Sequence, residues 1–150
     1  ILNQAFLTSK KNIIPKKIYS SWSLLNEKNA HKKHFGSLKT TNNANSFKLD
    51  DYIIKHKIKK IDFIKLDVDG YELDVLKSGY KFLKKNKTPI IFEVAPYLYK
   101  EHNYLQSDLV NLFKKLGYSF YNIHNLKKLK NVNKYISSIL DGESATLIAK

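Results

Sequence analysis

The fold of this chain is decided by the stretch Ile61-Asp62-Phe63-Ile64-Lys65-Leu66-Asp67-Val68-Asp69-Gly70-Tyr71-Glu72. Its first seven residues are mostly apolar and β-prone, which is typical of a strand buried on both faces. In residues 72–85 the apolar side chains recur at spacings of three and four, as in an amphipathic helix. The stretch therefore predicts a strand that passes through an acidic turn directly into a helix.

Further strands and helices follow in alternation. We expect strands at residues 90–94, 118–123 and 144–149, an edge strand at 1–7, a short helix at 49–56, and a helix capped by Ser107 and ended by Gly117. Residues 10–47 are polar with little periodicity, which indicates a long loop that is either functional or poorly ordered. The alternation predicts right-handed parallel crossovers and a three-layer α/β sheet.

Length and composition bound the class of protein. The 150 residues, of which 43% are hydrophobic, suffice for one domain with a core and are too few for two. The chain has no cysteine, which excludes disulfides, thiolate metal sites and cysteine nucleophiles. Because no apolar run approaches the ~18 residues of a membrane span, we expect a soluble, cytoplasmic protein. The opening on Ile1, without a cap or turn, leads us to expect a piece of a longer one.

The formal net charge of +14 raises the question of nucleic-acid binding. All 27 basic residues are lysines, dispersed along the chain, whereas arginine is the residue favoured for bidentate phosphate and base recognition. We therefore favour a solvated basic surface over a nucleic-acid site. A basic module that binds nucleic acid or an anionic polysaccharide remains the alternative.

Four carboxylates are expected along one edge of the sheet: Asp67, Asp69, Glu72 and, from the next strand, Glu93. In open parallel sheets, ligands bind beyond the carboxyl ends of the strands. Each acid also has a structural explanation. Asp69 and Glu72 fall in a first helical turn, where acids are favoured, and Lys65 could pair with Asp67. We favour a functional role for Asp67. For Glu93, a functional and a structural role are equally supported.

The same sequence argues against a metal site. Aligning Gly70 with the invariant glycine of an EF-hand loop puts Lys65 and Leu76 at ligand positions, which excludes that site. His31 and His34 form a possible metal pair, but without a third ligand we expect loop histidines. Three tyrosines after the strand at 90–94 could line a substrate mouth or pack under a loop: Tyr97, Tyr99 and Tyr104.

The stretch 61–72, followed by Val75-Leu76-Lys77 and residues 89–93, is similar to the signature of the FkbM-family methyltransferases. The similarity extends to residues 49–52 and 141–144, and Asp69 stands where the family usually has Glu. The resemblance implies that residues 1–150 are the carboxy-terminal part of a class I, Rossmann-like sheet, with mostly parallel strands flanked by helices. Residues 1–7 align with its third strand, so the first two strands, a glycine-rich turn and a ribose-binding acid are expected outside this sequence.

The same resemblance implies a function. S-adenosylmethionine is the expected cofactor, contacted by Asp67, Gln4 and Ala5, and Asp67, Glu72 and Glu93 are the expected catalytic carboxylates, with no metal. The expected reaction is O-methylation of a sugar or a small hydroxylated metabolite, and a small-molecule or glycan acceptor is the expected partner. Residues 1–150 alone are expected to be inactive. A degenerate domain that kept the sheet without catalysis is the further alternative.

Overall fold

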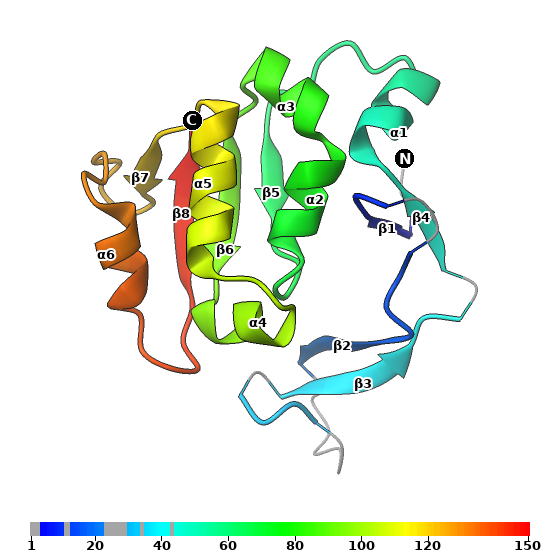
Figure 1. Ribbon diagram of the computed structural model, residues 1–150, viewed down its shortest axis with the longest axis horizontal. Helices are drawn as coiled ribbons and strands as arrows, with labels where there is room; N and C mark the ends of the chain where they lie inside the picture. The colour runs from blue at the N-terminus through cyan, green and yellow to red at the C-terminus, as the bar shows by residue number, and fades with distance from the viewer. Residues whose placement is uncertain (1–3, 11–12, 23–29, 34, 43) are drawn as a thin grey trace.

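The structure, a computed structural model, describes residues 4–10, 13–22, 30–33, 35–42 and 44–150 (Figure 1). The strands are β1 (Ala5–Leu7), β2 (Lys17–Trp22), β3 (Gly36–Thr40), β4 (Asn45–Phe47), β5 (Ile64–Leu66), β6 (Ile90–Val94), β7 (Phe120–Asn122) and β8 (Ala145–Ala149). The helices are α1 (Leu49–Lys55), α2 (Glu72–Ser78), α3 (Tyr80–Asn86), α4 (Pro96–Glu101), α5 (Gln106–Leu116) and α6 (Val132–Ser137). The class is α/β, as the alternation predicts.

The main sheet of the described residues has four strands in the order β5-β6-β8-β7. β5 and β6 pair in parallel, with Ile64 opposite Ile90 and Leu66 opposite Phe92. β8 is antiparallel to both of its neighbours, so β7 points the same way as β5 and β6. The crossovers thus deliver three strands of common direction, but the reversed β8 separates β7 from β6. The carboxyl ends of β5 and β6 meet at one edge.

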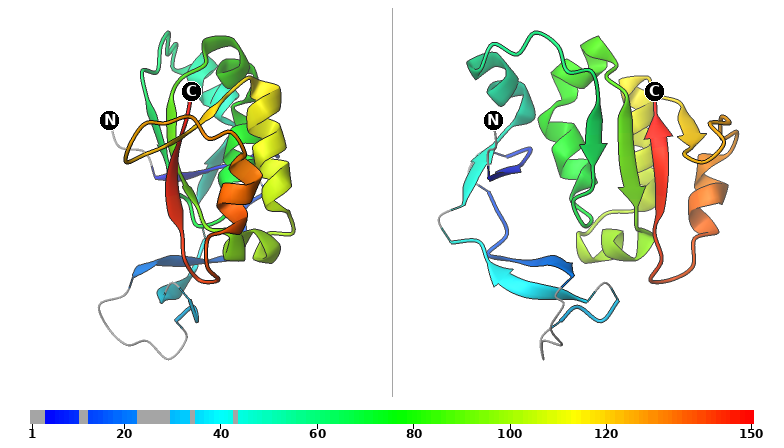
Figure 2. Two further views of the ribbon diagram at one scale, coloured as in Figure 1. Left: turned by 90° about the vertical axis from the view of Figure 1, so that its left-hand side faces the viewer. Right: turned by 180° about the vertical axis from the view of Figure 1, so that it is seen from behind.

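Helices α2, α3, α5 and α6 all lie on one face of this sheet (Figure 2). Leu66 points into the core and is 3% exposed, whereas Phe63 is 50% exposed and Lys65 lies open on the other face. The prediction that residues 61–67 form a strand buried on both faces was therefore wrong: the strand is shorter and half-exposed. The predicted three layers are two in the described part of the sheet, because the helices follow its strands on one side only.

The core lies between the sheet and α5. Its most buried side chains come from β6, β8 and the apolar face of α5 and have 0% exposure: Ile90, Phe92, Val94, Leu109, Val110, Phe113, Leu116, Leu147 and Ala149. The Phe92 and Phe113 rings pack with centroids 4.6 Å apart. Each of these side chains other than Ala149 contributes about 1.5–3 kcal/mol through removal from water. This core fixes β6, and with it the edge at which Glu93 lies.

The helix predicted over residues 72–85 is two helices, α2 and α3, broken at Gly79. A side chain at Gly79 would place its Cβ 2.6 Å from Leu49 Cδ2, so the break is also the place where α1 approaches. Ser78 supports it: its hydroxyl donates to the Val75 carbonyl at 2.7 Å and accepts from the Leu49 N–H at 3.3 Å. A Ser-Gly pair inside a helix is a known cause of such a kink.

The last long helix, α5, begins at Gln106 and is not capped by Ser107 as predicted. The Leu105 N–H donates to Asp108 Oδ2 at 2.9 Å, so the acid in the first turn satisfies the free backbone donor. Gly117 ends the helix with φ of 90°, the left-handed conformation predicted for it.

Residues 10–47, predicted as a long loop, contain three strands in their described part. β1 and β4 form a parallel pair of their own, and β2 and β3 form an antiparallel hairpin. The predicted strand at residues 1–7 is confirmed at Ala5–Leu7, but in this small sheet and not at the edge of the main one. The loop prediction failed because contacts far along the chain hold the hairpin. His31 binds Glu101, and Lys33 binds Asp141 at 2.5 Å.

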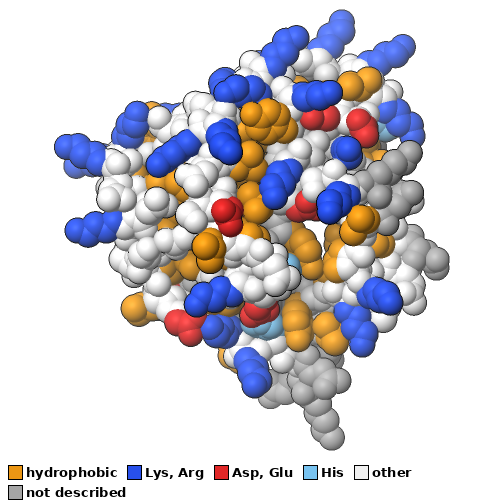
Figure 3. All heavy atoms as spheres, viewed as in Figure 1, with side chains coloured by type: hydrophobic (Ala, Val, Ile, Leu, Met, Phe, Trp, Pro, Cys, Tyr) orange, Lys and Arg blue, Asp and Glu red, His pale blue; other side chains and the backbone are white. Residues whose placement is uncertain are grey.

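Lysine side chains are spread over the visible face, interrupted by apolar and acidic groups (Figure 3). Such a distribution fits a solvated surface better than a groove that tracks a phosphate backbone. No helix in the described ranges is long and apolar enough to cross a membrane.

Candidate functional site

The acidic turn after β5 has two consecutive residues in left-handed backbone conformations. Asp69 has φ of 48° and Gly70 has φ of 92°, and the Tyr71 N–H donates to the Val68 carbonyl at 3.1 Å. Positive φ at both central positions is the requirement of a type I′ turn, for which Asp-Gly is a preferred pair. The turn ends β5, starts α2 at the next residue, and leaves Asp67 and Asp69 at the carboxyl edge of the sheet.

Asp67 lies at this edge in an ion pair with Lys65. The pair is the structural alternative that the sequence offered, and it is formed. The two side chains are 65% (Lys65) and 45% (Asp67) exposed, and an ion pair so open to water contributes little to stability. The Asp67 carboxylate is therefore held only weakly by Lys65.

Glu93, at the end of β6, is half-buried and faces Asp67 across the two strand ends. The Ser144 hydroxyl donates to Glu93 Oε1 at 2.6 Å. Burial raises the pKa of the Glu93 carboxyl, and the neighbouring Asp67 and Asp69 carboxylates raise it further. A carboxylate that binds a proton more readily than usual is a better proton acceptor. The structure brings Asp67, Asp69 and Glu93 to one edge, the arrangement expected from the strand order.

Glu72 lies elsewhere, beneath the turn, with 2% exposure. Its Oε1 accepts from the backbone N–H groups of Val68 at 3.4 Å and Gly70 at 3.3 Å, and its Oε2 lies 3.3 Å from the Tyr104 hydroxyl. Burial raises the pKa of Glu72 to about 7. Its carboxyl group thus braces the turn from inside and does not face the open edge.

The three tyrosines divide between the two roles considered for them. Tyr99, 1% exposed, stacks on Tyr104 with centroids 4.8 Å apart, so both pack under the loop. Tyr97 stands at the edge, with the Lys33 ammonium 5.2 Å from its ring. Burial, followed by the charge of Glu93, raises the pKa of the Tyr97 hydroxyl, so this ring lies within the field of the edge carboxylates.

His102 also belongs to this site, although the sequence alone gave no reason to expect it there. Its Nε2 lies 3.0 Å from the Asp69 carbonyl, and its ring packs on Tyr71 with centroids 4.1 Å apart. It also lies directly over Gly70. Because it is 33 positions from Asp69, no local pattern could have connected the two.

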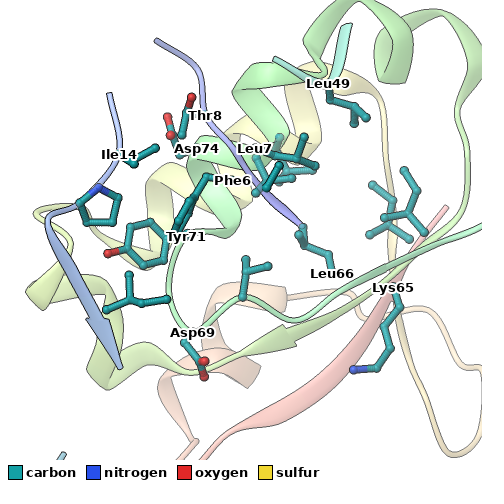
Figure 4. A pocket seen from close by; sticks show the side chains of 18 of the residues that line it. Phe6, Leu7, Thr8, Ile14, Leu49, Lys65, Leu66, Asp69, Tyr71 and Asp74 are labelled. Atoms are coloured by element: carbon teal, nitrogen blue, oxygen red, sulfur yellow. The ribbon is translucent and has the colours of Figure 1, made fainter. Parts of the chain in front are cut away.

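A cavity of about 630 Å³ lies beside the turn, between β1 and residues 13–19 on one side and β5 with α2 on the other (Figure 4). Its volume falls in the range of small-molecule pockets. Apolar side chains from both sides line most of it, and the visible face is hollowed between hydrophobic side chains (Figure 3). Ser9 donates to the Asp74 carboxylate and so ties the segment after β1 to α2.

The predicted cofactor residues take different places around this cavity. Ala5 lines it, together with Asp69 from the turn. Gln4 is exposed and immediately precedes β1, while Asp67 lies at the adjoining edge outside the lining.

His31 holds the β2–β3 hairpin to α4. Its Nε2 lies 3.2 Å from both carboxylate oxygens of Glu101, and its Nδ1 accepts from the Lys33 N–H at 3.2 Å. Both ring nitrogens are therefore engaged by protein groups. His34, its predicted metal partner, lies outside the described residues. Within the described ranges, no three His, Cys, Asp or Glu side chains are grouped to hold a metal ion.

The sequence of this chain matches a known protein family. The model of the methyltransferase FkbM domain matches residues 7–120, which include the turn, the edge carboxylates and the segment around His102. Comparisons with curated proteins and with solved structures gave no match.

Proposed function

Because the chain belongs to the FkbM methyltransferase domain family, matched over residues 7–120, we propose that it transfers methyl from S-adenosylmethionine to a hydroxyl oxygen of a sugar or small hydroxylated metabolite. Methyl transfer in general follows from the family. The observation that carries the finer proposal is the pair of carboxylates, Asp67 and Glu93, at one sheet edge beside a cavity of about 630 Å³.

The fold supports a Rossmann-like methyltransferase sheet. β5, β6 and β7 share one direction, and β5 crosses to β6 through α2 and α3. In sheets of this kind the ligand lies beyond the carboxyl ends of the strands, which is where the acidic turn and the cavity meet.

The residues at the edge fit a cationic cofactor. S-adenosylmethionine supplies an electrophilic methyl group on a positively charged sulfur. Asp67 and Asp69 supply negative charge at the strand end, and Ala5 lies on the opposite side of the cavity, with Gln4 exposed directly before it. We assign Asp67 to the cofactor because its carboxylate is exposed and its present partner, Lys65, is held only weakly.

Glu93 is the proposed proton acceptor for the attacking hydroxyl. Its pKa is raised by burial and by the neighbouring acids, and the Ser144 hydroxyl orients one oxygen. Tyr97 is proposed to contact the acceptor, because its ring lies at the same edge. Glu72 has an indirect role in this proposal. It holds the turn in place through its hydrogen bonds to the backbone and does not contact the acceptor.

The test is transfer of a labelled methyl group from S-adenosylmethionine to a panel of sugars and hydroxylated metabolites by the complete gene product. We expect transfer to at least one hydroxyl acceptor, lowered about tenfold or more by Glu93→Gln. Asp62→Asn, an exposed acid paired with Lys60 ahead of β5, is the matched control and should transfer normally. Transfer only to amines, or equal rates for the two variants, would contradict the proposal.

A further inference from the structure

The acidic turn is bonded by side chains from outside itself. Asp69 is a residue with a side chain at φ of 48°, a conformation that costs about 1 kcal/mol or more unless its surroundings hold it. The carbonyls of Asp69 and Gly70 lie beyond the sheet ladder, which ends at Leu66 opposite Phe92. Two side chains from the segment that joins α4 to α5 meet these carbonyls.

His102 meets the first carbonyl. A carbonyl oxygen only accepts hydrogen bonds, so the 3.0 Å contact requires the proton on Nε2 of His102. Burial lowers the pKa of His102, which favours the neutral imidazole. The ring also fills the space over Gly70, where an added Cβ would lie 2.3 Å from His102 Cδ2. Only glycine fits beneath it.

Tyr104 meets the second carbonyl. Its hydroxyl donates to the Gly70 carbonyl at 2.9 Å and lies 3.3 Å from Glu72 Oε2. The hydroxyl is the donor toward both acceptors, and the Gly70 carbonyl is the nearer of the two. The stack on Tyr99 fixes the Tyr104 ring in this position. Successive carbonyls of the turn are thus bonded by His102 and Tyr104, and its N–H groups by Glu72.

We propose that His102 and Tyr104 form a clamp that positions the acidic turn, and through it Asp67 and Asp69, for methyl transfer. The inference rests on the proposed function and extends it to two residues on the α4–α5 segment. They act through the turn, so they are positioning residues. A small displacement of a positioned group can cost ten- to a hundredfold in rate, and this sets the effect expected of the clamp.

The kinetic test uses His102→Ala, His102→Gln and Tyr104→Phe in the complete gene product. We expect His102→Ala to lower kcat/KM for S-adenosylmethionine about tenfold or more, and His102→Gln, whose amide can still donate, to recover much of the loss. Tyr104→Phe keeps the stack and loses only the hydroxyl bond, so a smaller loss is expected. His124→Ala, an exposed histidine after β7, is the control. Equal kcat/KM for His102→Ala and His124→Ala would overturn the proposal.

A second measurement does not depend on activity. The Tyr71 N–H closes the turn on Val68, so its hydrogen exchange reports whether the turn is held. We expect His102→Ala to speed this exchange about tenfold while amides in the core strand β6 keep their rates. If the wild-type protein transfers no methyl group, the proposed function fails, and the exchange result still decides the clamp. Unchanged exchange at Tyr71 would overturn it.

Discussion

Replacing Glu72 by Gln removes a charge from under the acidic turn while preserving the shape of the side chain. The wild-type carboxyl group is 2% exposed and accepts two backbone N–H bonds. Gln can accept the same bonds through its amide oxygen, so the turn should form in the variant. What changes is the response of stability to pH.

The magnitude follows from the pKa. Burial raises the pKa of Glu72 from its ordinary 4.5 to about 7 in the folded chain, so the folded state holds this proton more tightly than the unfolded state. Its stabilisation is therefore complete below about pH 4.5 and is lost as the pH rises through about 7. The difference between these two pKa values corresponds to a free energy of about 3 kcal/mol. Gln does not titrate, so the variant should gain about that much relative to wild type between pH 4.5 and 8.

The assay is urea unfolding of both proteins at a series of pH values across this window. Subtracting the two free energies of unfolding removes the contribution of titrating groups that do not interact with Glu72. Glu93, whose charge helps to raise the pKa of Glu72, is not one of them. Glu143→Gln, at an exposed acid, is the control, and its difference from wild type should stay level. A Glu72→Gln difference that also stays level, within about 0.5 kcal/mol, would refute the assignment of Glu72 as a buried carboxyl of raised pKa.

Two further substitutions test the fold around the site. Gly70→Ala and Gly142→Ala have nearly the same backbone strain, with φ of 92° and 87°, but only Gly70 lies under His102. Thermal unfolding should show a loss of about 1 kcal/mol for Gly142→Ala and at least twice that for Gly70→Ala, and equal losses would contradict the close packing. Phe92→Ala should cost about 3–5 kcal/mol in urea unfolding, against less than about 1 kcal/mol for exposed Ile54→Ala. A small loss for Phe92→Ala would mean that the core lies elsewhere.

The parts of the fold that local pattern determines were predictable. Asp69 and Gly70 indicated the turn, and Gly117 marked the end of α5. The spacing of four residues predicted the apolar face of α5, and all but the half-buried Leu112 are buried: Leu109, Leu112, Phe113 and Leu116. What failed depends on contacts across the chain. The reversed β8 enters the sheet by pairing with strands well before it, and the β2–β3 hairpin is held by pairs such as His31 with Glu101.

The candidate site divides in the same way. Asp67 and Glu93 end neighbouring parallel strands, so their meeting at one edge follows from the order of strands and helices. The inward direction of Glu72 does not follow from its place in a first helical turn, because it depends on Tyr104. The position of His102 depends on the path of α4, which no residue near the turn encodes.

The most direct test of the account is calorimetric titration of the complete gene product with S-adenosylmethionine, for wild type, Asp67→Asn and Asp62→Asn. We predict binding in roughly the micromolar range, weakened about fivefold by Asp67→Asn, the ~1 kcal/mol of a partly exposed ion pair. Asp62→Asn, which removes the charge of an exposed acid paired with Lys60, should bind like wild type. Absence of binding, or equal affinity for wild type and Asp67→Asn, would contradict the claim that this edge of the sheet holds the cofactor.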